Sequence, residues 1–446
     1  MISTTEFIYF IILELILFLY LNRTKDIKLK NILVIQNLIC IITLLVTHYY
    51  AYHNYITFPD ITFDGMKYDF YSHNISENIK AGVFKLSDMS IYSTIPVTGF
   101  IPYWTVTSID AKTPIHIIVG GIIYFLFGYS PIIYKFWNVF LFSLSTILIY
   151  KMQIHYKAPT LYTKLFAFNP YFIIYSVTMA KETMIILLVL IIFYHIYVKG
   201  VSLIETGLAL ILLFIYRPYI AVIMLLFLWL KVTRARYRIY VLILTIIILL
   251  SIEYSMELFS FIPNINEMNF AIKTNEGFQE YYMGIVPLLR SVIRSPLRFF
   301  KYILYYFYNA IFEPIPWVFS FKYGGEGELA YTSSAISFES LSRWLYSFIH
   351  IYLIAGIVRR LDNIIKNKEY LLLIILAFIT ILFNAIRTGV ERYQECITLP
   401  LLVIMLIMIP PDEKRNATNR MILLFCIYII IFLSDFIIRE RTIFNI

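Results

Sequence analysis

Long, uninterrupted apolar runs are the feature that most constrains what this chain can fold into. The segments 32–51 and 130–150, for example, are almost free of charges over roughly the 20 residues that a helix needs to cross a bilayer. Hydrophobic residues make up 60% of the 446 residues and charged residues only 15%, whereas soluble domains carry about 25% charged residues. This composition excludes a soluble globular enzyme, a disordered chain and a disulfide scaffold. The unbroken runs also exclude the alternating pattern of a β-barrel.

The pattern predicts an all-α, polytopic helical integral membrane protein with roughly 11–13 transmembrane helices. No internal repeat or low-complexity linker divides the chain, so residues 1–446 are expected to form a single transmembrane domain. The expected apolar segments are 6–21, 32–51, 130–150, 165–179, 183–198, 201–216, 219–230, 239–253, 338–356, 370–386, 393–410 and 421–438.

Lysine and arginine in short loops predict the orientation of these helices, because such loops are mostly cytoplasmic. The net charge of +9 is therefore interpreted as membrane topology and not as a nucleic-acid surface. Threading the helices places both termini and two long loops outside. Outer loop one covers 52–129, and outer loop two covers 254–337 with an interfacial amphipathic helix. The apolar stretch 299–318 is interpreted as interfacial or re-entrant. The basic loops are 22–31, 151–164, 231–238, 358–369 and 412–420.

Two carboxylates in outer loop one are the first candidate catalytic groups. Asp64 and Asp69 lie five residues apart among aromatic residues, soon after an apolar segment ends. A carboxylate placed there can act as a general base on an acceptor hydroxyl, or it can hold a sugar. The alternative interpretation is a solvated turn around Gly65.

Three further candidates stand at junctions between apolar segments. Lys181 and Glu182 separate the runs 165–179 and 183–198, and they are candidates for binding a phosphate group. The alternative is a polar turn that joins two short helices. Arg217 precedes a proline that breaks a helix. It either binds the substrate or anchors the helix at the membrane interface.

Outer arginines form two further groups that depart from the tendency of basic residues to stay inside. Arg290, Arg294 and Arg298 recur every four residues and would form one basic stripe on a helix. Such a stripe binds anionic lipid headgroups in general, or a lipid-linked pyrophosphate in particular. The second group is Arg387, Glu391 and Arg392 in a tight outer turn, for which we expect a binding role.

Missing motifs narrow the class of function. The sequence contains no Walker motif, no potassium-filter motif and no series of spaced arginines within an apolar run. Its three cysteines lack the spacing of a metal site or a disulfide framework, so we expect no metal and no cofactor. Polar residues gather in the outer loops above a hydrophobic base. This arrangement favours an enzyme whose substrate has its tail in the bilayer and its headgroup outside.

Several stretches carry a resemblance to known families. Tyr124–Pro131, followed by a helix with Asn138, resembles a stretch of membrane glycosyltransferases with the C-type fold. In that comparison Asp64 and Tyr68, with Asp69 beside the tyrosine, match an aspartate that is the proposed base. The overall build is similar to O-antigen and capsule repeat-unit polymerases, which use lipid-pyrophosphate-linked oligosaccharides as both donor and acceptor.

The resemblance implies a multi-pass glycosyltransferase of surface polysaccharide synthesis in the bacterial inner membrane. Its expected partners are a polyprenyl-linked saccharide, membrane lipid, and the chain-length regulator and flippase of the same pathway, with no nucleic acid. Two alternatives stay open. One is a C-type transferase that uses a polyprenyl-monophosphate sugar donor, and the other is a flippase or transporter for lipid-linked saccharides.

Overall fold

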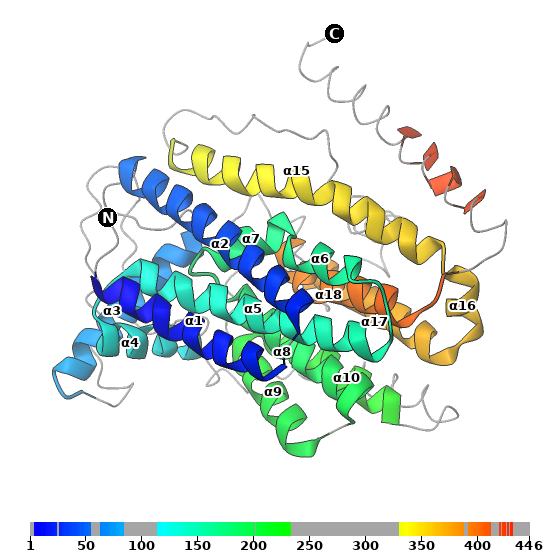
Figure 1. Cartoon of the computed structure of the whole chain (residues 1–446), viewed down its shortest axis with the longest axis horizontal. Helices are drawn as coiled ribbons and strands as arrows, with labels where there is room; N and C mark the ends of the chain where they lie inside the picture. The colour runs from blue at the N-terminus through cyan, green and yellow to red at the C-terminus, as the bar shows by residue number, and fades with distance from the viewer. Residues whose placement is uncertain are drawn as a thin grey trace, which may run out of the picture.

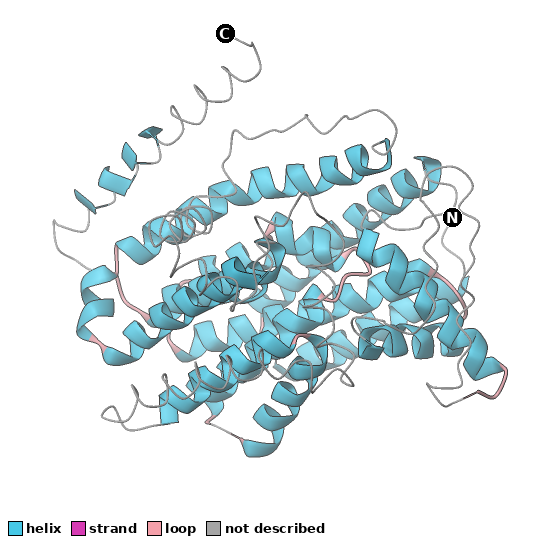
Figure 2. Cartoon of the chain, turned by 180° about the vertical axis from the view of Figure 1, so that it is seen from behind, coloured by secondary structure: helices cyan, strands magenta, loops and turns pink. Residues whose placement is uncertain are grey.

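The computed structural model shows a bundle of helices whose longest members run roughly side by side (Figure 1). All regular elements in the described part of the chain are helical, and Figure 2 shows the same from behind. The prediction of an all-α protein is therefore confirmed for these residues. The structure describes residues 4–24, 26–54, 63–83, 114–200, 202–232, 330–387, 391–411, 419–420, 422–424, 426–427 and 429–430.

The first two helices form an apolar pair. Helix α1 covers Thr4–Thr24 and α2 covers Ile27–Asn54. Asp26 lies just before α2, and its side chain accepts hydrogen bonds from the backbone N–H groups of Lys28 at 3.0 Å and Leu29 at 3.1 Å. These are donors that a helix N-terminus leaves unpaired. The hydroxyl of Tyr150 also donates to Asp26, at 2.7 Å, and so ties this turn to helix α5.

Helix α5, Pro131–His155, lies at the centre of the bundle (Figure 1). Proline at its first position suits a helix start because its missing N–H would be unpaired there in any case. Buried residues make up 78% of the α5 apolar window but only 28% of that of α1. Therefore α5 is the packing centre, and α1 leaves most of its apolar surface on the outside of the bundle.

The chain after α5 is broken into short helices. Helix α6 covers Leu161–Ala167, α7 covers Pro170–Ser176 and α8 covers Glu182–Tyr194, followed by a π-helical turn over His195–Lys199. The sequence predicts one apolar segment over 165–179, but the structure divides it at Phe168 and Asn169. The reason is local: Asn169 caps α7 by accepting from the Tyr171 N–H at 2.9 Å, and Pro170 cannot continue α6.

The remaining helices surround this centre, and α15 runs along one edge of the molecule in both views (Figures 1 and 2). The region predicted as outer loop one contains two helices within its described residues. The bounds are α3 Phe63–Lys80, α4 Pro114–Phe127, α9 Leu203–Tyr216, α10 Pro218–Val232, α15 Ala330–Val358, α16 Leu361–Lys366, α17 Lys368–Arg387 and α18 Glu391–Met408.

Within the described residues, four helices are long and apolar enough to cross a membrane, judged by length and composition: Thr4–Asn22, Ile27–Tyr49, Pro131–His155 and Glu182–Lys199. These apolar helices indicate a membrane protein. They correspond to the expected segments 6–21, 32–51, 130–150 and 183–198. The total of roughly 11–13 spans stays a prediction. The expected segment 239–253, the stretch 299–318 interpreted as interfacial or re-entrant, and most of outer loop two lie outside the described residues.

Helices α3 and α4 pack closely because two glycines of α4 face α3. A Cβ atom added at Gly121 would lie 2.4 Å from Cγ2 and 2.7 Å from Cβ of Ile75. At Gly120 it would lie 2.3 Å from Oγ of Ser72, whose hydroxyl also donates to the carbonyl of Ile117 at 3.2 Å. Only glycine allows this approach, so the α3–α4 pair depends on both positions.

We expect the substitution Gly121→Ala to lower the free energy of unfolding by about 1–3 kcal/mol, because Ile75 has to move away from the added methyl group. Gly207→Ala is the matched control, since a Cβ at Gly207 in α9 meets nothing within 4 Å. That control should be neutral, or stabilising by up to about 1 kcal/mol. Thermal unfolding of the purified protein in detergent measures both, and equal melting temperatures for the two variants would contradict the packing described here.

Candidate functional site

The interruption between α7 and α8, residues 177–181, is the centre of the candidate site. A helix that stops inside an apolar bundle leaves backbone carbonyls without partners, and these must find other donors. Asn138 of α5 donates its side-chain amide to the carbonyls of Thr178 at 2.7 Å and Ala180 at 3.0 Å. His116 of α4 donates from Nε2 to the intervening carbonyl of Met179 at 2.8 Å. Two side chains from two helices thus satisfy three consecutive carbonyls.

His116 is enclosed by tyrosine rings, and we call this group the His116 cluster: His116, Tyr68, Tyr134 and Tyr216. The centroid of the His116 ring lies 4.8 Å from that of Tyr68, 5.2 Å from that of Tyr134 and 5.9 Å from that of Tyr216. All three pairs have edge-to-face geometry. The Tyr134 hydroxyl lies 2.8 Å from Nδ1 of His116. Because Nε2 donates to Met179, Nδ1 of a neutral imidazole is the acceptor for this hydroxyl. The same hydroxyl also lies 2.8 Å from Nε2 and 3.0 Å from the backbone carbonyl of His116, so the bond to Met179 is the contact that orients the ring.

Lys181 and Glu182 follow the interruption directly. Lys181 is the N-cap residue of α8 and Glu182 its first residue, and their side chains are only 3% and 4% exposed. The Lys181 ammonium lies 5.8 Å from the centroid of the Tyr68 ring, within cation–π range. It is also close enough to His116 to act on it electrostatically. Burying charged groups this deeply costs free energy, and such groups usually have a function.

Asp69 of α3 is held by two tyrosines. Its carboxylate oxygens accept hydrogen bonds from the hydroxyls of Tyr124 at 2.6 Å and Tyr129 at 2.8 Å, and the side chain is 5% exposed. Burial raises the pKa of Tyr129 above its usual range, and the Asp69 charge raises it further. Tyr129 is therefore a neutral donor at physiological pH. The Tyr124 hydroxyl also lies 3.8 Å from Sδ of Met179, so Asp69 reaches the α7–α8 interruption through one side chain.

Arg217 stands at a second helix break. It is the C-cap residue of α9, its N–H donates to the carbonyl of Leu213 at 2.7 Å, and Pro218 starts α10 directly after it. The residue is 6% exposed. Its neighbour Tyr216 belongs to the His116 cluster, so the second break borders the same site.

The structure therefore places Lys181 against Tyr68 of the His116 cluster, and Asp69 reaches Met179 of the interruption through Tyr124. Glu182 follows Lys181 at the start of α8, and Arg217 follows Tyr216 at the end of α9. Asp64 is the second residue of the same helix as Asp69. Arg387 is the last residue of α17, and Glu391 and Arg392 are the first two of α18. Arg290, Arg294 and Arg298 lie outside the described residues.

Sequence reasoning missed several residues on which the site depends. His116 and Tyr134 were given no role, while Tyr124 and Asn138 entered only through a family resemblance. The available signal was a histidine and an asparagine inside apolar runs, since polar side chains at such positions are usually functional or tied to a broken helix. In the described part of the chain, no three His, Cys, Asp or Glu side chains are grouped as a metal site requires. The expectation that the protein needs no metal or cofactor stays a prediction.

Comparisons of the chain with protein-family models, with curated proteins and with solved structures found no match. The functional argument for this protein therefore depends on its own residues and their geometry.

We expect Asn138→Leu, which keeps most of the side-chain volume but removes the donor, to destabilise the protein by about 1–3 kcal/mol. Two buried carbonyls would lose their partner. Hydrogen exchange should show the effect locally, as faster exchange over residues 178–185 than over α5. Ser145→Ala is the control, because the equally buried Ser145 bonds only to the carbonyl of Leu141 in its own helix. Unchanged exchange in the Asn138 variant would contradict the assigned contacts.

The two tyrosines on Asp69 should differ in energetic weight. We expect Tyr124→Phe to cost about 1.5–3 kcal/mol of stability, since it removes a buried hydrogen bond to a charged group. Tyr129→Phe should cost less, because the Tyr129 side chain is 48% exposed and water can replace its hydroxyl. In an Asp69→Asn background the Tyr124→Phe effect should shrink, and a double-mutant cycle by thermal unfolding measures this coupling. An equal loss of stability in the two single variants would show that burial does not determine how much each tyrosine contributes.

Proposed function

We propose that this protein is a membrane glycosyltransferase of surface polysaccharide biosynthesis. In this proposal it polymerises saccharide repeat units carried on undecaprenyl pyrophosphate, at the outer face of the bacterial inner membrane. The chain is a multi-pass protein with its long loops on the periplasmic side. Its partners are the polyprenyl-linked saccharide and membrane lipid, together with the chain-length regulator and flippase of the same pathway.

The observation that carries the proposal is the gathering of buried charges of both signs at two helix breaks. Lys181 and Glu182 lie at one break, Arg217 lies at the other, and Asp69 reaches the first through Tyr124. These groups lie among apolar helices, where an isolated charge costs several kcal/mol. A substrate with a phosphate headgroup, a sugar and an apolar tail matches such surroundings in both polarity and charge.

Binding of the leaving group is assigned to the cations. Lys181 stands at the N-terminus of α8, where the helix dipole also favours an anion. Together with Arg217 it would stabilise the negative charge that develops on the pyrophosphate as the glycosidic bond breaks. We propose that two further groups complete the binding of the lipid-linked donor. One group is Arg290, Arg294 and Arg298, and the other is Arg387, Glu391 and Arg392.

Proton transfer is assigned to an aspartate of α3. The acceptor hydroxyl attacks the anomeric carbon, the bond to the pyrophosphate oxygen breaks, and a carboxylate takes the hydroxyl proton. Asp69 already accepts two tyrosine hydroxyls, so it is better placed to position Tyr124 and Tyr129. Asp64, one and a half turns earlier on the same helix, is then the proposed base, in line with the C-type resemblance.

The test is a gel of surface polysaccharide from a strain that lacks the gene, complemented with single variants. We expect the deletion to replace the ladder of chain lengths with a single repeat unit. Asp64→Asn and Lys181→Met should each reduce polymerisation by roughly 100-fold or more, since each removes a group that acts on the transition state. Lys181→Arg should keep part of the activity.

Lys80→Met is the matched control, because Lys80 at the end of α3 is exposed and pairs only with Glu77 at 2.7 Å. Protein levels are measured by size-exclusion chromatography of tagged variants, so that misfolding is separated from lost chemistry. A normal ladder with Lys181→Met at normal protein levels would refute the assigned site. Unchanged chain lengths in the deletion strain, with altered sugar content, would favour a transferase with a polyprenyl-monophosphate donor. Lipid-linked repeats retained on the cytoplasmic face would favour a flippase.

A further inference from the structure

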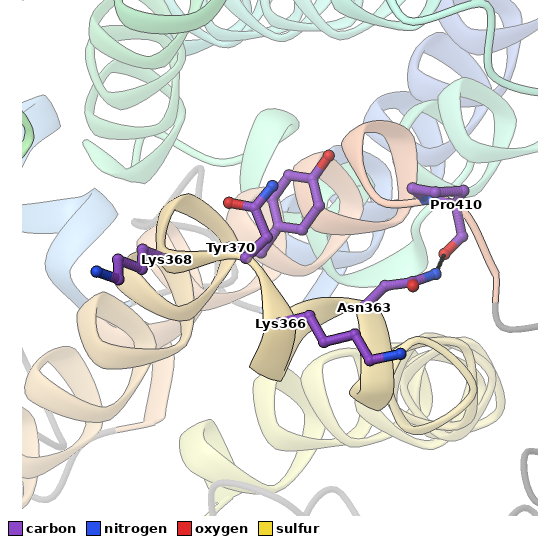
Figure 3. Close-up of a pocket in the computed structure, with 6 residues that line it drawn as sticks. Asn363, Lys366, Lys368, Tyr370 and Pro410 are labelled. Carbon is purple, nitrogen blue, oxygen red and sulfur yellow. Dashed lines mark hydrogen bonds between the residues drawn. The ribbon is translucent and has the colours of Figure 1, made fainter.

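A polar hollow of about 550 Å³ lies where α16, α17 and the end of α18 meet, within the basic segment 358–369 (Figure 3). The residues that line this hollow are all different from those of the His116 cluster. The lining residues are Asn363, Lys366, Asn367, Lys368, Tyr370 and Pro410. Hydrogen bonds hold its walls, since Asn363 donates to the carbonyl of Pro410 at 3.0 Å and Tyr370 to that of Met408 at 3.4 Å.

The charge at this hollow is positive. Its described lining includes two lysines and no carboxylate, and Figure 3 shows Lys366 and Lys368 extending from opposite sides of the turn between the two helices. Among the described residues, the acidic side chains on α16 and α17 are paired. Asp362 accepts hydrogen bonds from both terminal nitrogens of Arg420, at 2.8 and 3.1 Å, and Glu369 pairs with Lys231 of α10. The described lining therefore carries a positive charge that attracts an anion.

An apolar surface continues directly from the hollow. Leu371, Ile375 and Phe378 of α17 are 40%, 38% and 49% exposed. They follow Lys368 at spacings of three, four and three residues, which places all four on one helix face. A cationic hollow at the start of a helix and an exposed apolar stripe along it together match a molecule with an anionic head and a hydrocarbon tail.

We propose that this hollow binds the phosphate headgroup of an acidic membrane lipid, with an acyl chain lying along Leu371, Ile375 and Phe378. Lys366 and Lys368 attract the phosphate from either side of the hollow, and the Asn367 amide supplies a neutral donor. The charge rule for short loops places this segment on the cytoplasmic side. This lipid site is thus distinct from the outer-face chemistry proposed above. The lipid proposal does not depend on the proposed glycosyltransferase function. The role of the site is to anchor the α16–α17 corner to the anionic leaflet.

The experiment measures the melting temperature of the purified full-length protein in neutral detergent during titration with long-chain phosphatidylglycerol, phosphatidylcholine or inorganic phosphate. The test variant is the double substitution Lys366→Ala and Lys368→Ala. The control variant is Lys28→Ala with Lys164→Ala, which removes the same charge from two exposed lysines of other basic loops. Each lysine near an anionic lipid contributes on the order of 1 kcal/mol, so the test variant should need roughly tenfold or more additional lipid for the same thermal shift.

We expect phosphatidylglycerol to stabilise the original and control proteins, and phosphatidylcholine to have a much weaker effect. Equal stabilisation by inorganic phosphate at the same concentration, lost in the test variant, would identify a soluble phosphate compound as the occupant and overturn the lipid assignment. Equal phosphatidylglycerol dependence of the test and control variants would overturn the site itself. If the test variant does not fold, Lys366→Gln with Lys368→Gln provides the same charge removal, and the same comparison applies.

Discussion

Backbone carbonyls inside an apolar bundle must be hydrogen-bonded, and the interruption between α7 and α8 turns this constraint into a specific architecture. The amide of Asn138 and the imidazole of His116 supply the donors that the missing helical turn would have supplied. Because they come from α5 and α4, the interruption can form only when both helices are in place. Its formation in turn fixes where α8 begins. The central packing and the candidate site therefore depend on the same few hydrogen bonds.

The same constraint explains why charged residues gather where they do. A helix break carries polar backbone groups into apolar surroundings, so Lys181 and Glu182 can be buried there beside other polar atoms. Arg217 uses a second break in the same way, between α9 and Pro218. Asp69 is stabilised differently, by tyrosine hydroxyls from the α4 side. The result is a polar region whose groups are held by hydrogen bonds within the bundle, which is the kind of preorganised charge that the proposed glycosyl transfer would need.

Close helix contacts elsewhere keep this region in position. The glycines of α4 bring α3 close enough for Asp69 to meet Tyr124. On the other side of α5, Ser143 donates to Asn37 of α2 at 2.7 Å, and Asn37 donates to Glu14 of α1 at 2.8 Å. This chain links three helices through polar atoms within an apolar environment, where each such bond restricts how the helices can rotate or slide. Small residues and buried polar contacts thus determine the positions that apolar packing alone leaves open.

The sequence by itself determined the helical class, the main apolar helices and the break at Pro218, because hydropathy and proline act over a few neighbouring residues. The break at Asn169–Pro170 carries an equally local signal, but the prediction of one segment over 165–179 missed it. The sequence also marked Lys181, Glu182 and Arg217, since charges stand out at junctions between apolar segments, and it marked Asp69 as one of two carboxylates in outer loop one. Only the tertiary structure decided that Lys181 lies against Tyr68 and that Asp69 reaches Met179 through Tyr124. Asn138 reaches its carbonyl partners across 40 and 42 residues of chain and His116 across 63. Pairings at that distance depend on which helices pack together, and the hydrophobic period of a single sequence does not specify those partners.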